Sequence, residues 1–201
     1  MNTILYEVHH NLYVNLTNKC PCACTFCLRQ TRDHMENSGS LWLEHAPSIA
    51  EVLAEFDKFD MSKYEEVVFC GFGEPMEALD VLLETARFIK EKYQKPIRIN
   101  TNGLGDFINK KETAPLLKGL VDTVSISLNT PDAEEYLKLV RPKFGAGSYQ
   151  AMLDFAGKCT KYVPNVVMTT VATTLNEEEE ARCAEICKNV GASYRIRPWE
   201  D

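Results

Sequence analysis

Four cysteines lie within eight residues near the start of the chain: Cys20, Cys22, Cys24 and Cys27, half of the eight cysteines in the sequence. Thiolates this close together on one loop can bind a single metal centre without ligands from distant segments. They are the ligands of zinc and of iron–sulfur clusters. Three of them follow the spacing C-x3-C-x2-C, with the aromatic Phe26 just before the last cysteine. The sequence therefore predicts a metal centre in this loop.

Two kinds of centre fit this loop. A structural zinc site normally takes four protein ligands, so it would use Cys22 together with the three spaced cysteines. Zinc modules usually bring a second pair of cysteines or histidines further along the chain. An iron–sulfur centre held by Cys20, Cys24 and Cys27 is therefore the favoured interpretation. A non-catalytic zinc or iron–sulfur module stays open as the alternative.

The composition bounds the class of protein. A chain of 201 residues that is 45% hydrophobic and carries a net charge of −7 indicates one globular domain, residues 1–201, with a full core. An acidic chain lacks the broad basic face that nucleic acids require, so net charge does not indicate nucleic acid. Residues 1–10 contain no apolar run, and we expect no signal peptide and no membrane partner. We therefore expect a cytoplasmic protein whose cysteines are mostly thiols.

Six segments with the pattern of strands alternate with segments that have the pattern of helices. The predicted strands are residues 12–17, 66–70, 97–102, 122–129, 165–174 and 193–199, and the predicted helices are residues 49–59, 79–93, 131 onward, 148–162 and 177–190. This alternation indicates a parallel sheet with right-handed crossovers. A complete eight-fold barrel usually needs about 250 residues. The predicted fold is therefore α/β, a partial (β/α)6 TIM-like barrel.

Local capping signals mark the starts of three helices. Ser48 and Asn176 each stand three residues before a glutamate, Glu51 and Glu179, which is the pattern of a capping box. Pro131 is predicted to occupy the first position of a helix. Cysteines 159, 183 and 187 lie on apolar helix faces, where packing explains them better than a second metal pair does.

Polar side chains alternate with apolar ones along three of the predicted strands. The polar set is Arg98, Asn100, Asn102, Ser125, Ser127, Asn129, Arg195 and Arg197, and the apolar set is Ile97, Ile99, Val124, Ile126, Leu128, Tyr194 and Ile196. A sheet face covered by helices would be apolar. The polar set is therefore predicted to line an open lumen, with the alternative that some of its members only form hydrogen bonds at strand ends.

Loops after the first three predicted strands carry the residues of a known family. They are the cysteine loop, Gly71-Phe72-Gly73-Glu74-Pro75 and Thr101-Asn102-Gly103. Together they resemble the radical S-adenosylmethionine (SAM) superfamily over almost the whole chain. Residues 15–18, 41–44, 68–71 and 125–129 more narrowly resemble the TatD-associated radical SAM proteins. The resemblance implies a 4Fe-4S cluster that is held by Cys20, Cys24 and Cys27, with SAM on the fourth iron.

The same resemblance implies residues that bind SAM. The backbone of Gly71, Phe72, Gly73 and Glu74 would bind the amino group of SAM. Ser127 or Asn129 would contact its ribose or carboxylate, and Phe26 would border its adenine. Asn102 and Arg197 complete the expected set of SAM-binding residues. The two glycines allow a ligand to approach closely. Valine at position 73 is therefore expected to block SAM without loss of iron.

The resemblance also implies the reaction. A reduced cluster would cleave SAM to methionine and a 5′-deoxyadenosyl radical, with electrons from a donor such as flavodoxin or ferredoxin, and the radical would take hydrogen from an unknown substrate. Arg195 and Arg197 require an anion, because an unpaired buried charge is costly. That anion is the SAM carboxylate, an acid of the lumen or a group on the substrate. An incomplete barrel is laterally open, which in the superfamily that the sequence resembles goes with bulky substrates. The resemblance therefore implies a large substrate that carries an anionic group.

Overall fold

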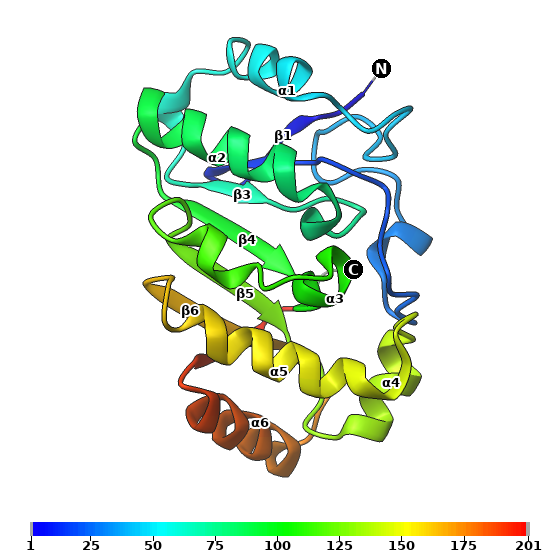
Figure 1. Ribbon diagram of the computed structural model, residues 1–201. Helices are drawn as coiled ribbons and strands as arrows, with labels where there is room; N and C mark the ends of the chain where they lie inside the picture. Colours follow the sequence, from blue (N-terminus) through cyan, green and yellow to red (C-terminus); the bar gives the residue numbers. More distant parts are fainter. Residues whose placement is uncertain (1, 200–201) are drawn as a thin grey trace.

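A seven-stranded sheet lies at the centre of the structure, a computed structural model that describes residues 2–199. Its strands are neighbours in sequence order: β1 (Leu5–Val8), β2 (Asn11–Val14), β3 (Val67–Phe69), β4 (Ile97–Thr101), β5 (Thr123–Ser127), β6 (Asn165–Val171) and β7 (Ser193–Arg197). Strands β1 and β2 are antiparallel, whereas every later pair is parallel. The arrows of β4 and β5 point toward the loop that follows β2, drawn in blue (Figure 1).

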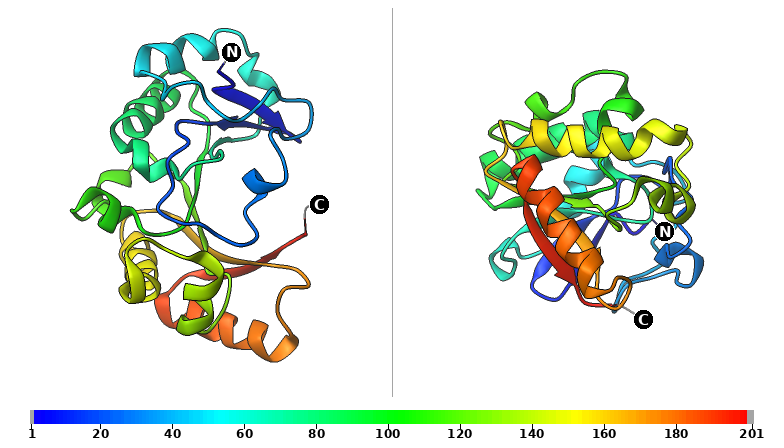
Figure 2. Two further views of the ribbon diagram at one scale, coloured as in Figure 1. Left: turned by 90° about the vertical axis from the view of Figure 1, so that its right-hand side faces the viewer. Right: turned by 90° about the horizontal axis from the view of Figure 1, so that it is seen from below.

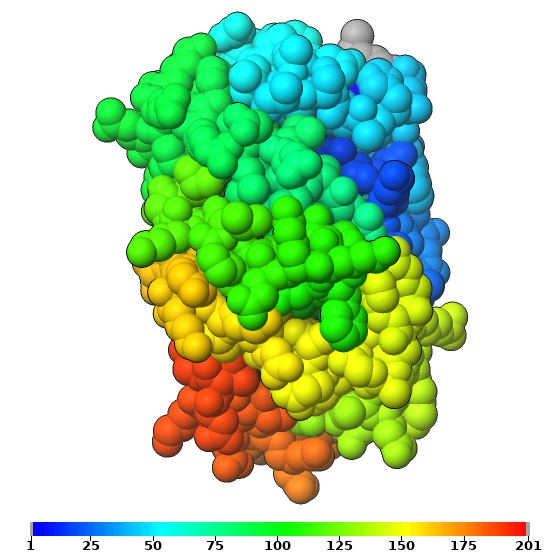
Figure 3. Space-filling view, in the orientation of Figure 1, coloured from blue at the N-terminus to red at the C-terminus, as the bar shows by residue number. Residues whose placement is uncertain are grey.

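Helices cover one face of this sheet. They are α1 (Ile49–Phe56), α2 (Leu79–Lys92), α3 (Gly105–Asn109), α4 (Ala133–Val140), α5 (Ser148–Cys159) and α6 (Glu177–Val190). Helices α2 and α5 lie in front of the strands in Figure 1, and the space-filling view shows the chain closed over the sheet on this side (Figure 3). The parallel strands and their connecting helices confirm the predicted α/β fold with a partial TIM-like barrel.

Several element boundaries differ from the predictions. The six predicted strands are β2 to β7, and β1 was not predicted because its apolar residues are too few to stand out. Helix α1 ends at Phe56, three residues earlier than predicted. The prediction that Pro131 begins a helix is wrong, because α4 begins at Ala133 and its N-cap is Asp132, whose side chain accepts a hydrogen bond from the backbone N–H of Glu135. An aspartate N-cap satisfies a free N–H group that proline cannot.

Both capping boxes and the buried cysteines are confirmed. The side chains of Ser48 and Asn176 accept from the backbone of the glutamate three residues later, and each glutamate accepts in return. Cys159, Cys183 and Cys187 are at most 1% exposed and belong to the main core. They therefore act as small apolar residues.

The two faces of the sheet separate as predicted, except at its edge. Ile97, Ile99, Val124 and Ile126 are fully buried under the helices. Ile196 was expected on this apolar face, but it is 40% exposed because β7 is the edge strand and nothing pairs beyond it.

The opposite face of the sheet carries the predicted polar residues. In the strand register Arg98 lies beside Thr123, Asn100 lies beside Ser125, and Arg195 lies beside Thr169. Viewed toward the ends of the strands, the sheet forms an arc with the helices outside it and the blue loop between its two ends (Figure 2, left). The polar face thus lines the concave side of a partial barrel. Within residues 2–199, no helix is both long and apolar enough to cross a membrane.

Candidate functional site

The cysteine loop is held against the segment that follows α4. Cys22 forms an isolated bridge with Pro142, and the backbone N–H of Lys143 donates to the carbonyl of Pro21 at 2.8 Å. The first half of the loop therefore has a fixed path, although it contains no helix or strand. Cys20, Cys24 and Cys27 are half-buried, whereas Cys22 is only 4% exposed and belongs to the core.

The thiols of this loop differ in their readiness to ionise. The neighbouring Cys22 thiol lowers the pKa of Cys20 to about 6 and also lowers the pKa of Cys24, because its S–H can donate to either sulfur. The same contacts raise the pKa of Cys22 itself, while burial raises the pKa of Cys27. Because the thiolate is the form that binds metal, these directions favour Cys20 and Cys24 as ligands over Cys22.

The donor set of the loop fits an iron–sulfur cluster with three ligands. Among residues 2–199, no three cysteine, histidine or acidic side chains are arranged so that they could already hold a metal ion. Cluster binding would therefore require the three half-buried cysteine side chains to rotate toward a common centre. Cys22 is buried, and its sulfur lies beside those of Cys20 and Cys24.

The glycines of the turn after β3 pack against the segment that precedes the cysteines. A Cβ atom on Gly73 would lie 2.2 Å from the carbonyl oxygen of Thr17 and 2.7 Å from that of Lys19. A Cβ atom on Gly71 would lie 2.1 Å from the Oδ1 atom of Asn15. The close approach that these glycines permit is thus to the protein's own chain. The sequence analysis expected valine at position 73 to block SAM without loss of iron. This expectation must be corrected, because the larger side chain would displace the cysteine loop and iron binding would be lost as well.

Glu74 links the turn to the end of β4. Its Oε1 atom accepts from the Thr101 hydroxyl at 2.6 Å and from the Met76 N–H at 3.2 Å, and its Oε2 atom accepts from the Asn102 N–H at 2.8 Å. Its own backbone N–H donates to the carbonyl of Lys19 at 2.8 Å. The residue is 4% exposed, and burial raises the pKa of its carboxyl to about 7.

Asn102 brings the third loop to the cysteines. Its Nδ2 atom lies 3.6 Å from Cys22 Sγ and 4.0 Å from Cys20 Sγ, while its Oδ1 atom accepts from the backbone N–H of Leu104 at 2.9 Å. The structure therefore brings together the cysteine loop, the glycine turn and Asn102 at the carboxyl ends of β2, β3 and β4.

Two aromatic residues of the predicted site have different surroundings. Phe72 is 7% exposed and packs edge-on against Trp42, with 5.2 Å between ring centroids. Its side chain therefore packs in a small hydrophobic cluster with Tyr6, Val8 and Leu41, and only its backbone is available to a ligand. Phe26 is 40% exposed in the cysteine loop and is free to cover a bound molecule.

The other predicted SAM-binding residues lie further along the sheet. Ser127 is half-buried beside Thr169, and Asn129 follows it with a φ of 67°. Arg197 lies beside Val171 near the end of β7. All three are at the carboxyl ends of their strands, and within residues 2–199 no hydrogen bond or ion pair joins them to the cysteine loop.

Two lumen residues were missed by the sequence analysis. The thiol of Cys70 hydrogen-bonds with Asn100, and burial raises its pKa. Burial also raises the pKa of Tyr13, which hydrogen-bonds with Arg98. The period-two pattern of the first two strands would have placed both residues on the polar face.

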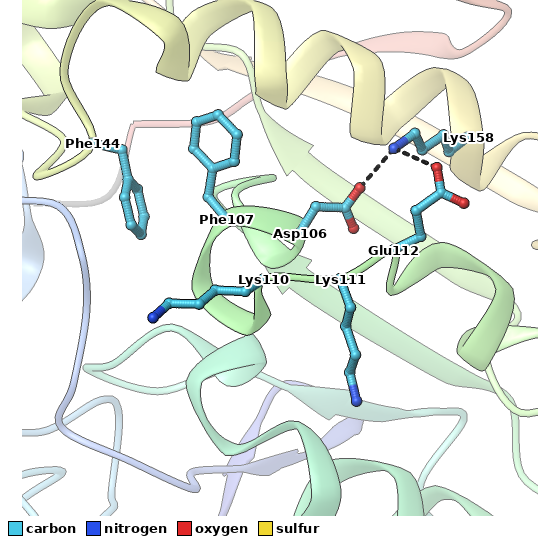
Figure 4. Close-up of a pocket in the computed structure, with 7 residues that line it drawn as sticks. All are labelled: Asp106, Phe107, Lys110, Lys111, Glu112, Phe144 and Lys158. Carbon is cyan, nitrogen blue, oxygen red and sulfur yellow. Dashed lines mark hydrogen bonds and ion pairs between the residues drawn. The ribbon is translucent and has the colours of Figure 1, made fainter.

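A hollow of about 630 Å³ lies away from these residues, on the helical side of the sheet. Its lining is Asp106, Phe107, Lys110, Lys111, Glu112, Phe144 and Lys158 (Figure 4). Lys158 pairs with Asp106 at 3.0 Å and with Glu112 at 2.9 Å, as the dashed lines show. None of the predicted site residues lines this hollow, so we do not assign the reaction to it.

Comparison with known proteins identifies the family. The family model described as the radical SAM superfamily matches residues 14–187. The chain belongs to the radical SAM superfamily. It is 31% identical over 197 residues to a GTP 3′,8-cyclase of Corynebacterium glutamicum, which covers 94% of this chain and 49% of the relative. It is 27% identical over 157 residues to a probable dual-specificity RNA methyltransferase, RlmN 1, of Protochlamydia amoebophila, covering 72% of this chain and 40% of that protein.

This radical SAM chain has the same fold as a solved structure of another protein. Streptococcus suis SuiB bound to S-adenosylmethionine aligns with a TM-score of 0.64 and 15% identity, over 94% of this chain and 38% of that one. The chain spans about half the length of the first curated relative, at 49%. Radical SAM proteins use a 4Fe-4S cluster and SAM. Membership therefore favours the iron–sulfur interpretation of the cysteine loop over the zinc module.

Proposed function

We propose that this radical SAM chain cleaves SAM reductively and starts radical chemistry on a substrate in its lumen. The observation that carries the proposal is the meeting of the cysteine loop, the glycine turn and Asn102 at one end of the parallel strands. When bound, the reduced cluster and SAM supply a 5′-deoxyadenosyl radical that takes a hydrogen atom from the substrate. The protein's residues bind, orient and shield these groups.

The ligands that we propose for the cluster are Cys20, Cys24 and Cys27. The Cys22 thiol lies beside two of them, where its single S–H can stabilise the thiolate of one or the other. Carbonyl groups of the turn from Gly71 to Glu74 would accept the amino group of SAM. Asn102, Ser127, Asn129 and Phe26 would complete the cofactor site. Arg197, which the resemblance also placed there, would instead face the substrate.

We propose a large substrate with an anionic group, held in the open lumen. The polar concave face and its arginines support this assignment, and the relatives named for GTP and for RNA methylation are consistent with it. An electron donor such as flavodoxin or ferredoxin would reduce the cluster, which favours a cytoplasmic setting. We further propose that residues 1–201 form one radical SAM core domain and that the chain belongs to the TatD-associated subgroup, on the motif residues given above.

Anaerobic reconstitution with iron and sulfide tests the proposed reaction. The reconstituted protein is incubated with SAM and dithionite, and 5′-deoxyadenosine is measured by chromatography. We expect the product from the wild type and none from a variant with Cys20, Cys24 and Cys27 all replaced by alanine. Wild-type protein that takes up zinc in place of iron and forms no 5′-deoxyadenosine would refute the proposal and support the zinc module.

A further inference from the structure

Three arginines lie on the concave face of the partial barrel. Arg98 lies on β4, whereas Arg195 and Arg197 lie on β7, at the far end of the arc of strands (Figure 2, left). They share the concave face of the sheet. Arg195 is close enough to the other two for their charges to lower its pKa, after the larger effect of its partial burial. The curvature of the sheet thus brings together residues that are about one hundred positions apart in the sequence.

The positive charge of this group is only partly balanced. Arg98 pairs with Glu66 at 2.9 Å, and their side chains are 13% and 26% exposed. Neither Arg195 nor Arg197 forms an ion pair with a carboxylate of residues 2–199, so no internal salt bridge holds either of them within that range. The Nε atom of Arg98 is buried and has no hydrogen-bond partner in that range. Among residues 2–199, one carboxylate thus pairs with this group of three arginines, and Arg195 and Arg197 are left without an ion-pair partner in that range.

We propose that Arg98, Arg195 and Arg197 bind one phosphate group of the substrate. This inference rests on the proposed function, because it places the phosphate on the molecule that the radical attacks. A phosphate monoester carries up to two negative charges and three free oxygens, which match the two uncompensated charges and three forks of donors. A single carboxylate would satisfy fewer donors and leave one positive charge in a partly buried place, which is costly.

Strand β4 separates one of these arginines, Arg98, from the cluster. Arg98 follows the first residue of β4, whereas Asn102 lies just beyond the last residue of that strand and faces the cysteines. The strand thus carries one anchor toward its amino end and the cofactor contact at its carboxyl end. A substrate held by its phosphate would direct the rest of the molecule toward the cofactor.

Calorimetry with inorganic pyrophosphate tests the site without knowledge of the substrate. The protein is reconstituted and saturated with SAM, so that the SAM carboxylate cannot compete for the arginines. We compare the wild type with R195Q, R197Q and R98K, the last chosen to retain a partner for Glu66. Arg182, exposed on α6, provides the matched control R182Q, which removes the same charge from the surface. Acetate is the control ligand.

We expect R195Q and R197Q each to weaken pyrophosphate binding about tenfold, the loss that corresponds to one charge-assisted hydrogen bond, while R182Q has less than a twofold effect. The phosphate site would be overturned if R182Q weakened pyrophosphate binding as much as R195Q and R197Q do. It would also be overturned if acetate bound as tightly as pyrophosphate. Loss of SAM binding in R197Q would overturn the place of Arg197 in it. Pyrophosphate binding that depends on the arginines in a protein that forms no 5′-deoxyadenosine would support the site and refute only the proposed reaction.

Discussion

Replacing Glu74 with glutamine tests the buried carboxyl that joins the glycine turn to β4. In the folded protein burial raises the pKa of Glu74 to about 7, compared with an ordinary value of 4.5. Between these values the folded state holds a proton that the unfolded chain has released. The stability contributed by this proton is fully present below pH 4.5 and is lost as the pH rises through about 7. Glutamine has no such dependence.

The size of the effect follows from the two pKa values. Each unit of pKa corresponds to about 1.4 kcal/mol. The free energy of unfolding of the wild type, relative to Glu74→Gln, should therefore fall by about 2.5 kcal/mol between about pH 5 and about pH 8. Because Glu74 is only 4% exposed, solvent does little to screen this contribution.

Urea unfolding of the apoprotein, followed by circular dichroism at both pH values, measures this difference. Glu91→Gln, on the exposed face of α2, is the matched control and should not change the pH dependence of stability. A difference between wild type and Glu74→Gln that is the same at both pH values would refute the reasoning. It would mean that the carboxyl is as well solvated in the folded protein as in the unfolded chain.

Three further substitutions test other parts of the structure. Gly73→Val should lower the iron content after reconstitution, because a Cβ atom there would approach the backbone before the cysteines to 2.2 Å; Gly157→Ala, where nothing lies closer than 3.9 Å, should leave iron unchanged. Cys22→Ala should retain the iron and the visible absorbance that Cys24→Ala loses, and the opposite result would reverse their roles. Phe56→Ala should lower the free energy of unfolding by about 3–5 kcal/mol, measured in urea, because this fully buried ring leaves a cavity; a loss below about 1 kcal/mol would show that the core refills the space.

Features that depend on neighbouring residues could be predicted from the sequence. The spacing of Cys20, Cys24 and Cys27 indicated a cluster loop because chemistry at one centre requires ligands a few residues apart. The capping box from Ser48 to Glu51 was found because both partners lie within one helical turn. The prediction for Pro131 failed for the same kind of reason, since an aspartate next to it offered a better N-cap.

The alternation of strands and helices also predicted the partial barrel and its polar concave face. Alternate side chains of a strand point to opposite faces, so Arg98 and Asn100 were assigned to the lumen without knowledge of the fold. The prediction failed for Ile196, because period alone does not show which strand lies at the edge of a sheet.

The sequence by itself determined the chemistry of the cysteine loop, the order of the elements and the face on which each strand residue lies, because these depend on local spacing and on the period of the backbone. Only the tertiary structure decided that Cys22 is buried, that Gly73 packs against the segment before the cysteines, and that Arg98 shares the concave face with the arginines of β7. Such contacts join residues that are far apart in the chain. They depend on the curvature of the sheet and on the packing of its loops, which no local pattern specifies.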